Sequence, residues 1–445
     1  MLPILILLAC VDAKGPPPTE SVPSYTSAQV SAVSASVDDD IGALVWVDWQ
    51  QDADATVWVE YRFEGEAWSA TPSRPVAAGP ARQLVAGVPY GETAELRVVN
   101  DFGDGALAGD ALTIDNAPLP GLVPLPESVD GDVSAWDPDT NYLFLSLVDA
   151  DFGSWVFIVD REGRPVWAVE SPYGRISLHS RVSLDGTDLL VDENSYWAIF
   201  DDGAASQVKR MKLDGTVVET VDTPGLHHPF TDLPDGSLVY TAAGRRSETL
   251  DRRSPDGSVT TVWDCKDLLE AVGDDGTCSS NTIWYNPADG HILNSLYSLE
   301  TIVDVDIDAG VAVEWFGHTT DAWAFDPPES AFYWQHGGNI TAAGTLLTST
   351  EGEGGAHETV VREYRLDTAS KTLVQVWSFG EGEGIYGDVM GEAHRLANGN
   401  TLHNLGSATR IREVTPDGVV VWDVNWRAET MGRSTPIADL YAFVE

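Results

Sequence analysis

The sequence predicts an all-β protein in which a small β-sandwich is followed by a β-propeller. Apolar and polar residues alternate in short runs, and glycine-containing turns separate these runs. Two short sequence units recur through the second part of the chain. The chain has 445 residues, which is more than one ordinary hydrophobic core can organise. A propeller accommodates this length because each blade packs only on its neighbours.

The predicted sandwich occupies residues 25–116. Alternating strand patterns lie at 43–47, 55–61 and 94–99, and a corner with the sequence Gly-Val-Pro-Tyr-Gly lies within 84–92. This order of strands resembles a fibronectin type III or immunoglobulin-like sandwich. We interpret the domain as a spacer or a cap on the next domain, with a separate ligand-binding role left open.

The predicted propeller occupies residues 125–445, after a linker at 117–124. One repeated unit runs from an aliphatic residue and Asp, through a turn, to a Trp. The other reads Leu-x-Asp/Asn-Gly-x-x-Leu. The first unit ends at Trp167, Trp263, Trp315 and Trp422, and the second lies at 184–186, 233–238 and 396–402. Asp-Gly and Asn-Gly pairs form hairpin turns because their backbone adopts positive φ readily. The alternation predicts about six blades, with each Trp packing between blades.

The charge balance excludes one class of partner. The chain has 70 acidic and 25 basic residues, and its formal net charge is −45. Such a surface repels phosphate backbones, so we expect no nucleic-acid partner. Solubility and divalent-cation binding both remain open as reasons for the acidity. An anionic substrate would need its own local hydrogen-bond donors.

The N-terminus resembles a lipoprotein signal. Residues 1–10 form a short apolar run that ends in Leu-Leu-Ala-Cys, although no Lys or Arg precedes it. Cys10 is then the lipidation site, and the Pro-rich residues 11–24 form an extended tether. No other stretch is long and apolar enough to span a bilayer. We therefore expect an exported, periplasmic or cell-surface lipoprotein that meets the membrane only through this anchor.

The other two cysteines are predicted to form a disulfide. Cys265 and Cys278 would close a short loop, which contributes about 3 kcal/mol in the chain-entropy model. A metal pair is disfavoured, because no CxxC spacing or nearby His ligand is present. Residues 304–310 begin like a calcium loop, but Ala309 stands where that loop needs Gly. We interpret them as a strand that ends in a turn, and we expect no metal site.

Two histidines share one register in the repeats. His228 and His336 each lie eight residues before a turn glycine, Gly236 and Gly344 respectively. This spacing places both on innermost strands, which line the channel of a propeller. His179 and His394 lie closer to their turns and are less well aligned. For a pair of histidines in one register, structural and catalytic roles remain equally open.

Four motifs in order carry a resemblance to a known family. They are Leu-His-His-Pro-Phe at 226–230 with Leu-Pro-Asp-Gly at 233–236, Asn-Thr-Ile-Trp-Tyr-Asn-Pro at 281–287, Tyr-Trp-Gln-His at 333–336, and the segment 396–422. Together they resemble the bacterial arylsulfotransferases over residues 150–425. The preceding sandwich is also similar to the N-terminal β domain of that family.

The resemblance implies a chemistry. In the family, a channel histidine attacks the sulfur of an aromatic sulfate ester, and the resulting sulfohistidine passes the sulfuryl group to a phenol, without cofactor or phosphoadenosine donor. By resemblance His336 is the nucleophile, and His228, with His227 behind it, donates to a sulfate oxygen or the leaving group. Neutral imidazole suits the role, because it is a nucleophile near its ordinary pKa of about 6.5.

Further substrate contacts are expected from Asn281, Tyr297 and Arg245. The sequence departs from the family at two of its sites. Ser279 stands where the family has a His, and Tyr297 stands where it has an Arg that binds sulfate. Losing one charged donor typically costs on the order of 10²–10³ in rate. Arg245 and Arg246 are candidates to replace the lost charge.

Three functions therefore remain open. The chain is an arylsulfotransferase-type enzyme, a catalytically silent propeller that binds a ligand or partner, or a different hydrolase or lyase on the same scaffold. No Gly-x-Ser-x-Gly elbow, phosphate loop or zinc spacing is present. The oligomeric state is not predicted.

Overall fold

The computed structural model confirms an all-β protein. It describes residues 29–63, 65–149, 153–198, 201–244, 247–352 and 356–444, so residues 1–24, Cys10 and Arg245 lie outside the described part. The chain divides into two compact units. The first runs to Pro120 and also includes Pro165–Trp167, and the second is formed by Gly121–Arg164 and Ala168–Glu445. No helix in the described ranges is long and apolar enough to cross a membrane.

The first unit is built from two antiparallel sheets. Its core is formed by alternate residues of the strands, among them Trp49, Val57 and Leu96. One sheet has the order β1 (Val30–Val37), β2 (Val45–Gln51), β6 (Gly79–Val85). The other has the order β4 (Ser69–Ala70), β3 (Ala55–Phe63), β7 (Thr93–Asp101), β8 (Ala106–Ala108), with β5 (Arg74–Val76) on β3 and β9 (Leu112–Asp115) on β7.

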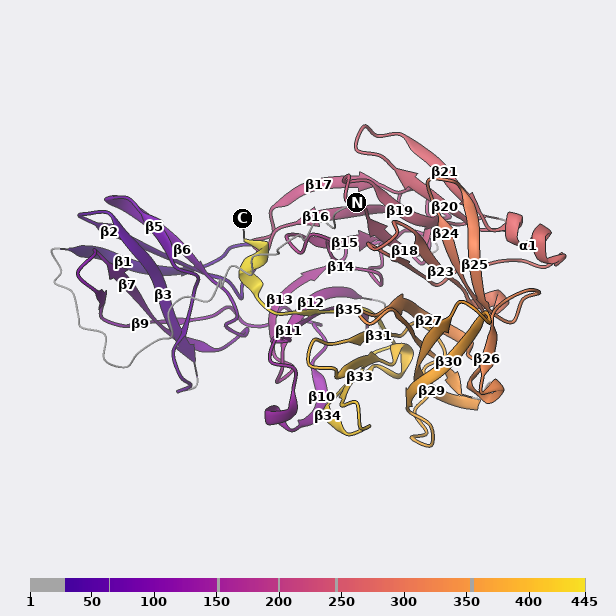
Figure 1. The fold of residues 1–445 in the computed structure, drawn as a ribbon. Helices are drawn as coiled ribbons and strands as arrows, with labels where there is room; N and C mark the ends of the chain where they lie inside the picture. Colours follow the sequence, from indigo (N-terminus) through magenta and orange to yellow (C-terminus); the bar gives the residue numbers. More distant parts are fainter. Residues whose placement is uncertain are drawn as a thin grey trace, which may run out of the picture. The chain divides into compact units, whose positions relative to one another are not determined.

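In the second unit the described strands form six sheets (Figure 1). The first contains β35 (Thr430–Ile437), β11 (Tyr142–Val148), β12 (Ser154–Asp160) and β13 (Pro165–Glu170). The second contains β14 (Arg181–Val182), β15 (Leu189–Glu193), β16 (Gln207–Met211) and β17 (Val217–Asp222). The third contains β18 (Leu226–Asp232), β19 (Leu238–Ala242), β20 (Thr249–Arg253) and β21 (Val259–Asp264).

The other three sheets follow in chain order. The fourth contains β22 (Thr282–Tyr285), β23 (Ile292–Leu296), β24 (Thr301–Asp306) and β25 (Val311–Gly317). The fifth contains β27 (Tyr333–Ile340), β28 (Thr345–Gly352), β29 (Ala356–Asp367), β30 (Thr372–Phe379) and β26 (Ala324–Asp326). The sixth contains β31 (Glu392–Arg395), β32 (Thr401–Asn404), β33 (Arg410–Val414), β34 (Val420–Trp426) and β10 (Pro126–Gly131).

One strand from each sheet reaches a common centre. We call these the inner strands: β14, β18, β22, β27, β31 and β35. Residues of all six line one cavity of about 340 Å³. The two ends of the unit are joined by strand pairing, because β35 pairs with β11 and β34 pairs with β10. The first and sixth sheets each therefore combine strands from both ends of the unit.

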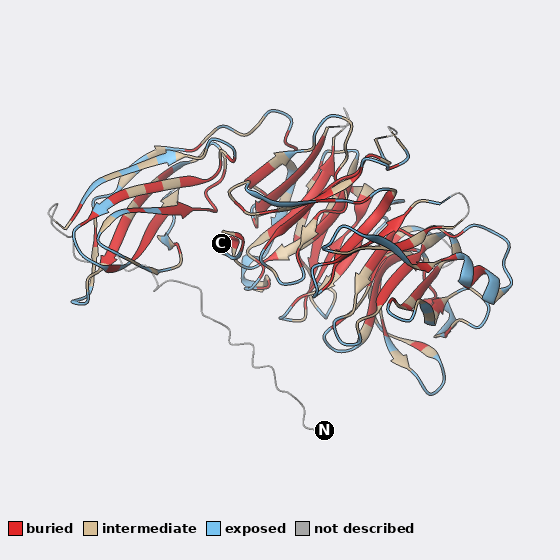
Figure 2. Ribbon diagram, turned by 90° about the horizontal axis from the view of Figure 1, so that it is seen from above, coloured by how far each residue is buried: buried red, intermediate tan, exposed pale blue. Residues whose placement is uncertain are grey.

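The repeats predicted from the sequence have the expected local structure. Gly236 has a φ of 82°, and Asp235 accepts a hydrogen bond from the backbone N of Ser237, which closes the turn between β18 and β19. Trp263 is buried in a cluster that joins the third and fourth sheets. Strands such as β18 and β19 are buried along their whole length, whereas outer strands such as β17 and β21 are exposed along half or more of theirs (Figure 2). Strand β24 runs to Asp306 and is followed by a turn at Gly310, as the sequence predicts.

Cys265 and Cys278 form a disulfide in the structure. The loop between them contains the single α-helix among the described residues, α1 (Lys266–Val272), which ends at Gly273 with a φ of 72°. Leu268 and Leu269 of this helix are buried with the disulfide in the cluster between the third and fourth sheets. The sequence analysis did not predict this helix, because its seven residues are too few for a helical period to stand out.

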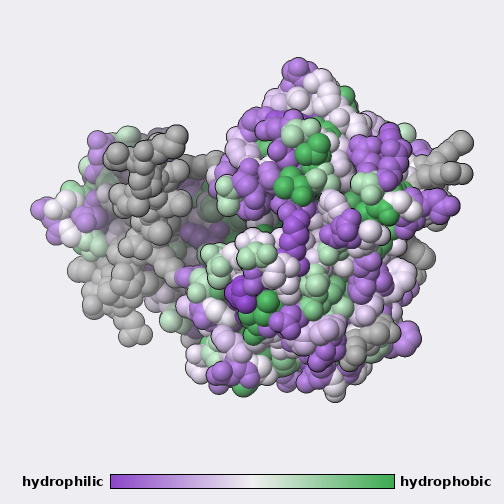
Figure 3. All heavy atoms as spheres, turned by 45° about the vertical axis from the view of Figure 1, so that its right-hand side comes forward, coloured by the Kyte–Doolittle hydropathy of each residue, from purple (hydrophilic) through white to green (hydrophobic). Residues whose placement is uncertain are grey.

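Five segments among the described residues form 3-10 turns, and one of them carries a predicted site residue. The turns are η1 (Val133–Ala135), η3 (Pro328–Ser330), η4 (Gly406–Ala408) and η5 (Leu440–Phe443), and η2 (Tyr297–Leu299) carries a predicted site residue. On the face shown in Figure 3, hydrophilic residues predominate and apolar residues form small separate groups. This distribution agrees with the strongly acidic composition.

Candidate active site

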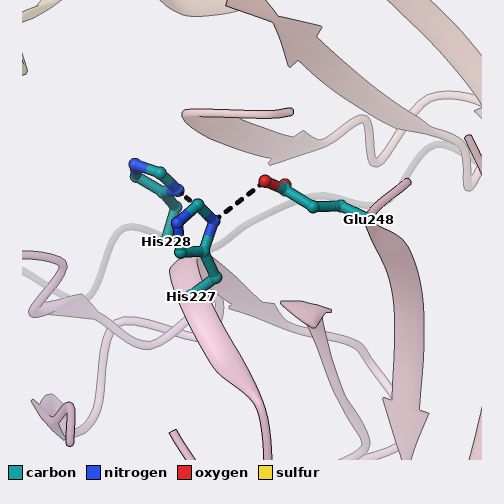
Figure 4. Close-up of side chains that lie close together, drawn as sticks. All are labelled: His227, His228 and Glu248. Carbon is teal, nitrogen blue, oxygen red and sulfur yellow. Dashed lines mark hydrogen bonds and ion pairs between the residues drawn. The ribbon is translucent and has the colours of Figure 1, made fainter. Parts of the chain in front are cut away.

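The first residues of inner strand β18 supply two histidines to one site. Successive residues of a strand normally point to opposite faces. Here the pairing of β18 with β19 shifts register between Leu226 and Phe230, which marks a bulge. As a result the rings of His227 and His228 meet, with centroids 3.8 Å apart and planes at 86°. Figure 4 shows the two rings side by side above the strand.

A carboxylate completes this cluster. The Nδ1 atoms of His227 and His228 are 2.6 Å apart, and His227 Nδ1 is 2.9 Å from Glu248 Oε1 (Figure 4). The other oxygen of Glu248 accepts hydrogen bonds from the backbone N and the hydroxyl of Ser280, at 2.8 and 2.6 Å. His227, His228 and Glu248 are all buried. We call these three residues the His-His-Glu cluster.

Aromatic rings surround the cluster. Trp197 stacks on His227 at 5.2 Å between centroids, and Tyr196 meets the edge of the same ring at 4.4 Å. The ring centroid of Tyr297 lies 6.3 Å from that of His228, and the ring centroid of Trp334 lies 6.1 Å from that of Tyr297. Trp197 and Trp334 are partly exposed, with relative accessibilities of 38% and 47%. A planar aromatic ligand can therefore be received between rings that already face solvent.

His336 lies on inner strand β27, and its ring orientation is set by the backbone. Its Nδ1 is 2.9 Å from the carbonyl oxygen of Trp334. A carbonyl only accepts, so Nδ1 carries the proton and Nε2 carries the lone pair. Trp334 has a φ of 48°, a left-handed conformation that is costly for a non-glycine residue and typical of functional sites. The pairing of β27 with β28 shifts on both sides of His336.

His336 is held in its neutral form. Burial is the main cause that lowers its pKa, to about 3, and the positive charge of Arg433 lowers it further. Burial also lowers the pKa of His228 well below its usual range, with contributions from His227, His179 and His336. These shared electrostatic effects place His228, His336 and Arg433 in one neighbourhood. The two register-matched histidines therefore lie within electrostatic range of each other, although neither is among the residues that line the central cavity.

Arg433 is the charged residue that the sequence analysis missed. It lies on β35, and it donates to the backbone oxygens of Gly391 and Asn281, at 2.7 Å each. It is also 3.7 Å from Glu392. Burial lowers the pKa of this guanidinium, and Glu392 opposes that effect. No signal marked Arg433, because it lies outside every repeat unit and reaches the centre only through the pairing of the C-terminal strand.

His179 was also left aside in the sequence analysis, because its spacing is irregular. It lies just before β14, is 1% exposed, and its ring is 5.8 Å from that of His228. Neither ring nitrogen has a hydrogen-bond partner among the described residues. Asp192 accepts a hydrogen bond from the backbone N of His179 at 3.0 Å, which fixes the segment. Burial lowers the pKa of His179 well below its usual range, and so does the charge of Arg433.

The cavity at the centre has a different lining. Beside His179 and Arg433 it is lined by Arg181, Glu392, His394 and Arg395. Burial acts to raise the pKa of Glu392, but His394, Arg433 and the backbone N of Ser434 outweigh it and bring the pKa to about 2. Arg395 pairs with Glu363, and Arg181 donates to the backbone oxygen of Phe230. These positive charges are therefore largely matched by carboxylates and carbonyls.

A family model matches this chain over most of the second unit. The model of the arylsulfotransferases (ASST) covers residues 135–432. The chain belongs to the arylsulfotransferase family. The donor and acceptor classes of this family are aryl sulfates and phenols, so an arylsulfotransferase-like function follows in general terms. Comparison with curated proteins finds no match.

Solved structures similar to this arylsulfotransferase-family chain are distant. A protein of unknown function from Bacteroides caccae is 14% identical, covers 67% of this chain and 100% of its own, and has a TM-score of 0.46. A streptogramin B lyase is 12% identical, covers 69% and 97%, and has a TM-score of 0.39. A virginiamycin B lyase from Staphylococcus aureus is 11% identical, covers 70% and 99%, and has a TM-score of 0.38.

The two positions where this chain departs from its family are neighbours in space. Ser279 hydrogen-bonds the side chain of Tyr297, and that bond partly offsets the burial that raises the pKa of Tyr297. Asn281, by contrast, is turned to the protein: its Nδ2 donates to the backbone oxygen of Gln335 at 2.8 Å. Asn281 thus holds the residue before His336. Arg245 lies outside the described residues, so its place in the site is not described.

Proposed function

We propose that this protein transfers a sulfuryl group from a phenolic sulfate ester to a phenol through a covalent intermediate on His336. The observation that supports it most directly is the state of the His336 ring. The Trp334 carbonyl holds the proton on Nδ1, and the low pKa leaves Nε2 with a free lone pair. A neutral imidazole beside aromatic rings is the nucleophile that this reaction requires.

We propose that the six sheets of the second unit are the blades of a six-bladed propeller spanning 125–445. The cavity shared by all six inner strands and the strand pairing of both ends support this arrangement. For the first unit, residues 25–116, we propose a fibronectin type III or immunoglobulin-like sandwich. Its two antiparallel sheets around one core support that assignment.

The reaction takes place in two displacements. In the first, the lone pair of His336 Nε2 forms a bond to sulfur as the ester S–O bond breaks, and the aryl oxygen leaves with the bonding electrons and takes up a proton. In the second, the oxygen of the acceptor phenol bonds to sulfur and gives up its proton as the S–N bond breaks. The imidazole is then restored, and no oxidant or reductant is needed.

Neutral donors serve the sulfate oxygens in this site. Tyr297 keeps its hydroxyl proton at neutral pH, since the ordinary pKa of a tyrosine is about 10 and burial raises it further. It therefore donates a hydrogen bond where the family uses an Arg. We assign His228, with His227 behind it, to a sulfate oxygen or the leaving aryl oxygen. Arg433 supports the negative charge from behind, since its effect reaches both His228 and His336.

We also propose that the protein is exported and carried on the membrane as a lipoprotein. The apolar residues 1–10, ending in Cys10, support this assignment. The net charge of −45 disfavours a nucleic-acid partner. A small aromatic sulfate ester and a phenol are the partners that the proposal requires.

The test is turnover of a chromogenic aryl sulfate in the presence of excess phenol. Aryl release that depends on added phenol, and that is lost in His336→Ala, supports the proposal. His291→Ala is the matched control, because His291 is half-buried just before β23, where it pairs with Asp304, and its variant must keep full activity. If His336→Ala turns over as fast as the unmodified protein, His336 is not the nucleophile.

A second function is favoured by one observation. The side chains of Ser279 and Tyr297 interact by a hydrogen bond, and Arg433 donates its NH groups to backbone oxygens of the protein. A silent propeller that binds an aromatic sulfate without turnover fits these contacts. Tight binding of the ester, measured by calorimetry in folded protein that shows no phenol-dependent release, would identify this function.

A further inference from the structure

We propose that the His-His-Glu cluster binds a divalent transition-metal ion of the zinc class. The three ligand atoms, His227 Nδ1, His228 Nδ1 and Glu248 Oε1, all lie within 4.8 Å of one another. All three side chains are buried. Two imidazoles and one carboxylate are a common ligand set for zinc, and three protein ligands leave a fourth position open. This differs from the sequence expectation of no metal.

The hydrogen bonds of the cluster do not balance without a cation. His227 Nδ1 faces both His228 Nδ1 at 2.6 Å and Glu248 Oε1 at 2.9 Å. One imidazole nitrogen carries either one proton or one lone pair. His227 Nδ1 therefore cannot form a full hydrogen bond with His228 and another with Glu248 at the same time. A cation among the three atoms removes the conflict, because each then supplies a lone pair. Tetrahedral ligands at about 2.0–2.1 Å from zinc lie further apart than these atoms, so the two Nδ1 atoms must separate by roughly 0.7 Å, and His227 Nδ1 and Glu248 Oε1 by roughly 0.4 Å.

The surroundings of the cluster have the features of a supported metal site. Ser280 holds the second oxygen of Glu248 with two hydrogen bonds, which leaves Oε1 to face the histidines. The backbone oxygen of His227 accepts from Trp197 Nε1 at 2.5 Å and from Asn194 Nδ2 at 3.3 Å. The bulge in β18 points both rings the same way. These contacts fix the orientation of the ligands before any ion arrives.

The consequence for catalysis rests on the proposed function. The other ring nitrogen of His228 lies on the far side of its ring from Glu248 (Figure 4), where it stays free to donate. An ion at the cluster supplies positive charge close to the place where Ser279 and Tyr297 replace the charged donors of the family. A sulfate oxygen of the ester can then take the open position.

A second group in the chain offers a control. Asp289, His291 and Asp304 also bring three ligand atoms together, but on the surface, where Asp289 is exposed and the other two are half-buried. His291 Nδ1 is 2.9 Å from Asp304, which is an ordinary hydrogen bond with no conflict. We therefore expect this surface group to bind the ion weakly and the buried cluster to bind it tightly.

The test is equilibrium dialysis of the full chain against zinc, after removal of metal with a chelator. We expect one tightly held zinc ion per chain, weakened at least about tenfold in Glu248→Gln and in His228→Gln, as for the loss of one ligand contact. His291→Ala must retain it. Unchanged binding in both cluster variants, or no tight binding in the unmodified chain, overturns the proposal. Cobalt gives a second readout, since its visible spectrum must change in Glu248→Gln.

The outcomes separate this proposal from the proposed function. His336→Ala must bind zinc like the unmodified protein while losing sulfuryl transfer. Circular dichroism shows whether a cluster variant is folded, and the milder variant Ser280→Ala, which removes only one bond to Glu248, must reduce zinc affinity without loss of structure. If the metal-free protein transfers sulfuryl groups at full rate and binds no zinc, the metal proposal fails and the enzyme proposal stands.

Discussion

The centre of the propeller-like unit contains two chemically different halves. The histidine half consists of His227, His228, Tyr297, Trp334 and His336. The pKa values of His228 and His336 are lowered, and Trp334 is partly exposed. The arginine half surrounds the cavity and consists of Arg181, Glu392, His394, Arg395 and Arg433. The two halves share inner strands, since β18 supplies His228 to the histidine half and Phe230 to the cavity that the arginine half surrounds.

The two halves differ in what their residues do: one holds the inner strands together, and the other carries the reactive groups. In the arginine half, charges are matched by carboxylates and by backbone oxygens from neighbouring sheets, so the groups are engaged in holding the inner strands together. In the histidine half, the ring of His336 keeps its lone pair because burial and the positive charge of Arg433 lower its pKa. The first half should therefore respond to mutation through stability, and the second through rate.

The largest expected effect is on rate in the histidine half. His336→Gln removes the nucleophile while keeping a polar side chain of similar size. We expect phenol-dependent aryl release to fall by about 10³-fold or more, with the melting temperature within a few degrees of the unmodified protein. Steady-state kinetics and a thermal melt on the same sample check this. A small loss of rate would move the nucleophile to another residue.

The next largest effect is on stability in the arginine half. Arg433→Met removes the guanidinium beside the buried carboxylate of Glu392, which keeps only His394 as a basic neighbour, and leaves two backbone oxygens without a donor. We expect the free energy of unfolding to fall by about 3 kcal/mol. Urea denaturation measures it, with the exposed Arg365→Met as the control. An unchanged midpoint would mean that Arg433 does not hold the inner strands.

A gain of function sharpens the comparison from the opposite side. Ser279→His with Tyr297→Arg restores the two family residues at positions that already contact each other. We expect kcat to rise by about 10-fold to 10²-fold, since one charged donor is typically worth about that much or more. Tyr297→Phe, which removes only the hydroxyl, must lower kcat. A double variant slower than Tyr297→Phe would show that these positions do not serve the sulfate group.

The pH dependence of rate tests the neutral state of His336. Its pKa is lowered to about 3, so Nε2 keeps its lone pair as the pH falls through the range where an ordinary His takes up a proton. We expect kcat/KM to show no acid limb attributable to this residue between about pH 7 and pH 4. An acid limb centred near pH 6.5 would contradict the assignment, if the stability of the substrate-free protein does not change over the same pH range.

The last effect concerns stability outside both halves, and it develops only as the pH falls. His403, on β32, hydrogen-bonds Ser349, and burial lowers its pKa to about 3. The unfolded state then binds more protons than the folded state between about pH 6.5 and pH 3, so stability is lost as the pH falls. The contribution is about 1.4 kcal/mol per pH unit. His403→Asn should flatten the slope of unfolding free energy against pH, and an unchanged slope would show that His403 does not titrate on unfolding.

The sequence predicts the repeated parts of this molecule well. The turns at Asp-Gly pairs, the all-β class and the placement of His228 and His336 on inner strands follow from local spacing, because register within a repeat fixes the place of a residue in its sheet. His227 was assigned a supporting role only through family resemblance. Its direction could not be predicted, because adjacent strand residues normally point apart and a bulge has no signal in the sequence.

Glu248 and Arg433 could not be predicted from the sequence for a different reason. Each reaches the centre from a segment with no motif: Glu248 precedes β20, and Arg433 lies on the last strand, which pairs with β11. Contacts made across sheets depend on how the ends of the unit pair, and local spacing carries no information about that. The short helix α1 escaped for want of length.

The most direct measurement of the central claim is capture of the covalent intermediate. The full chain is mixed with an aryl sulfate in the absence of phenol, quenched in alkali, digested and analysed by mass spectrometry. We expect the peptide containing His336 to gain the mass of one sulfuryl group, and added phenol to remove it. A sulfuryl group on another residue, or phenol-dependent transfer with no modified peptide at any time, would contradict a covalent intermediate on His336.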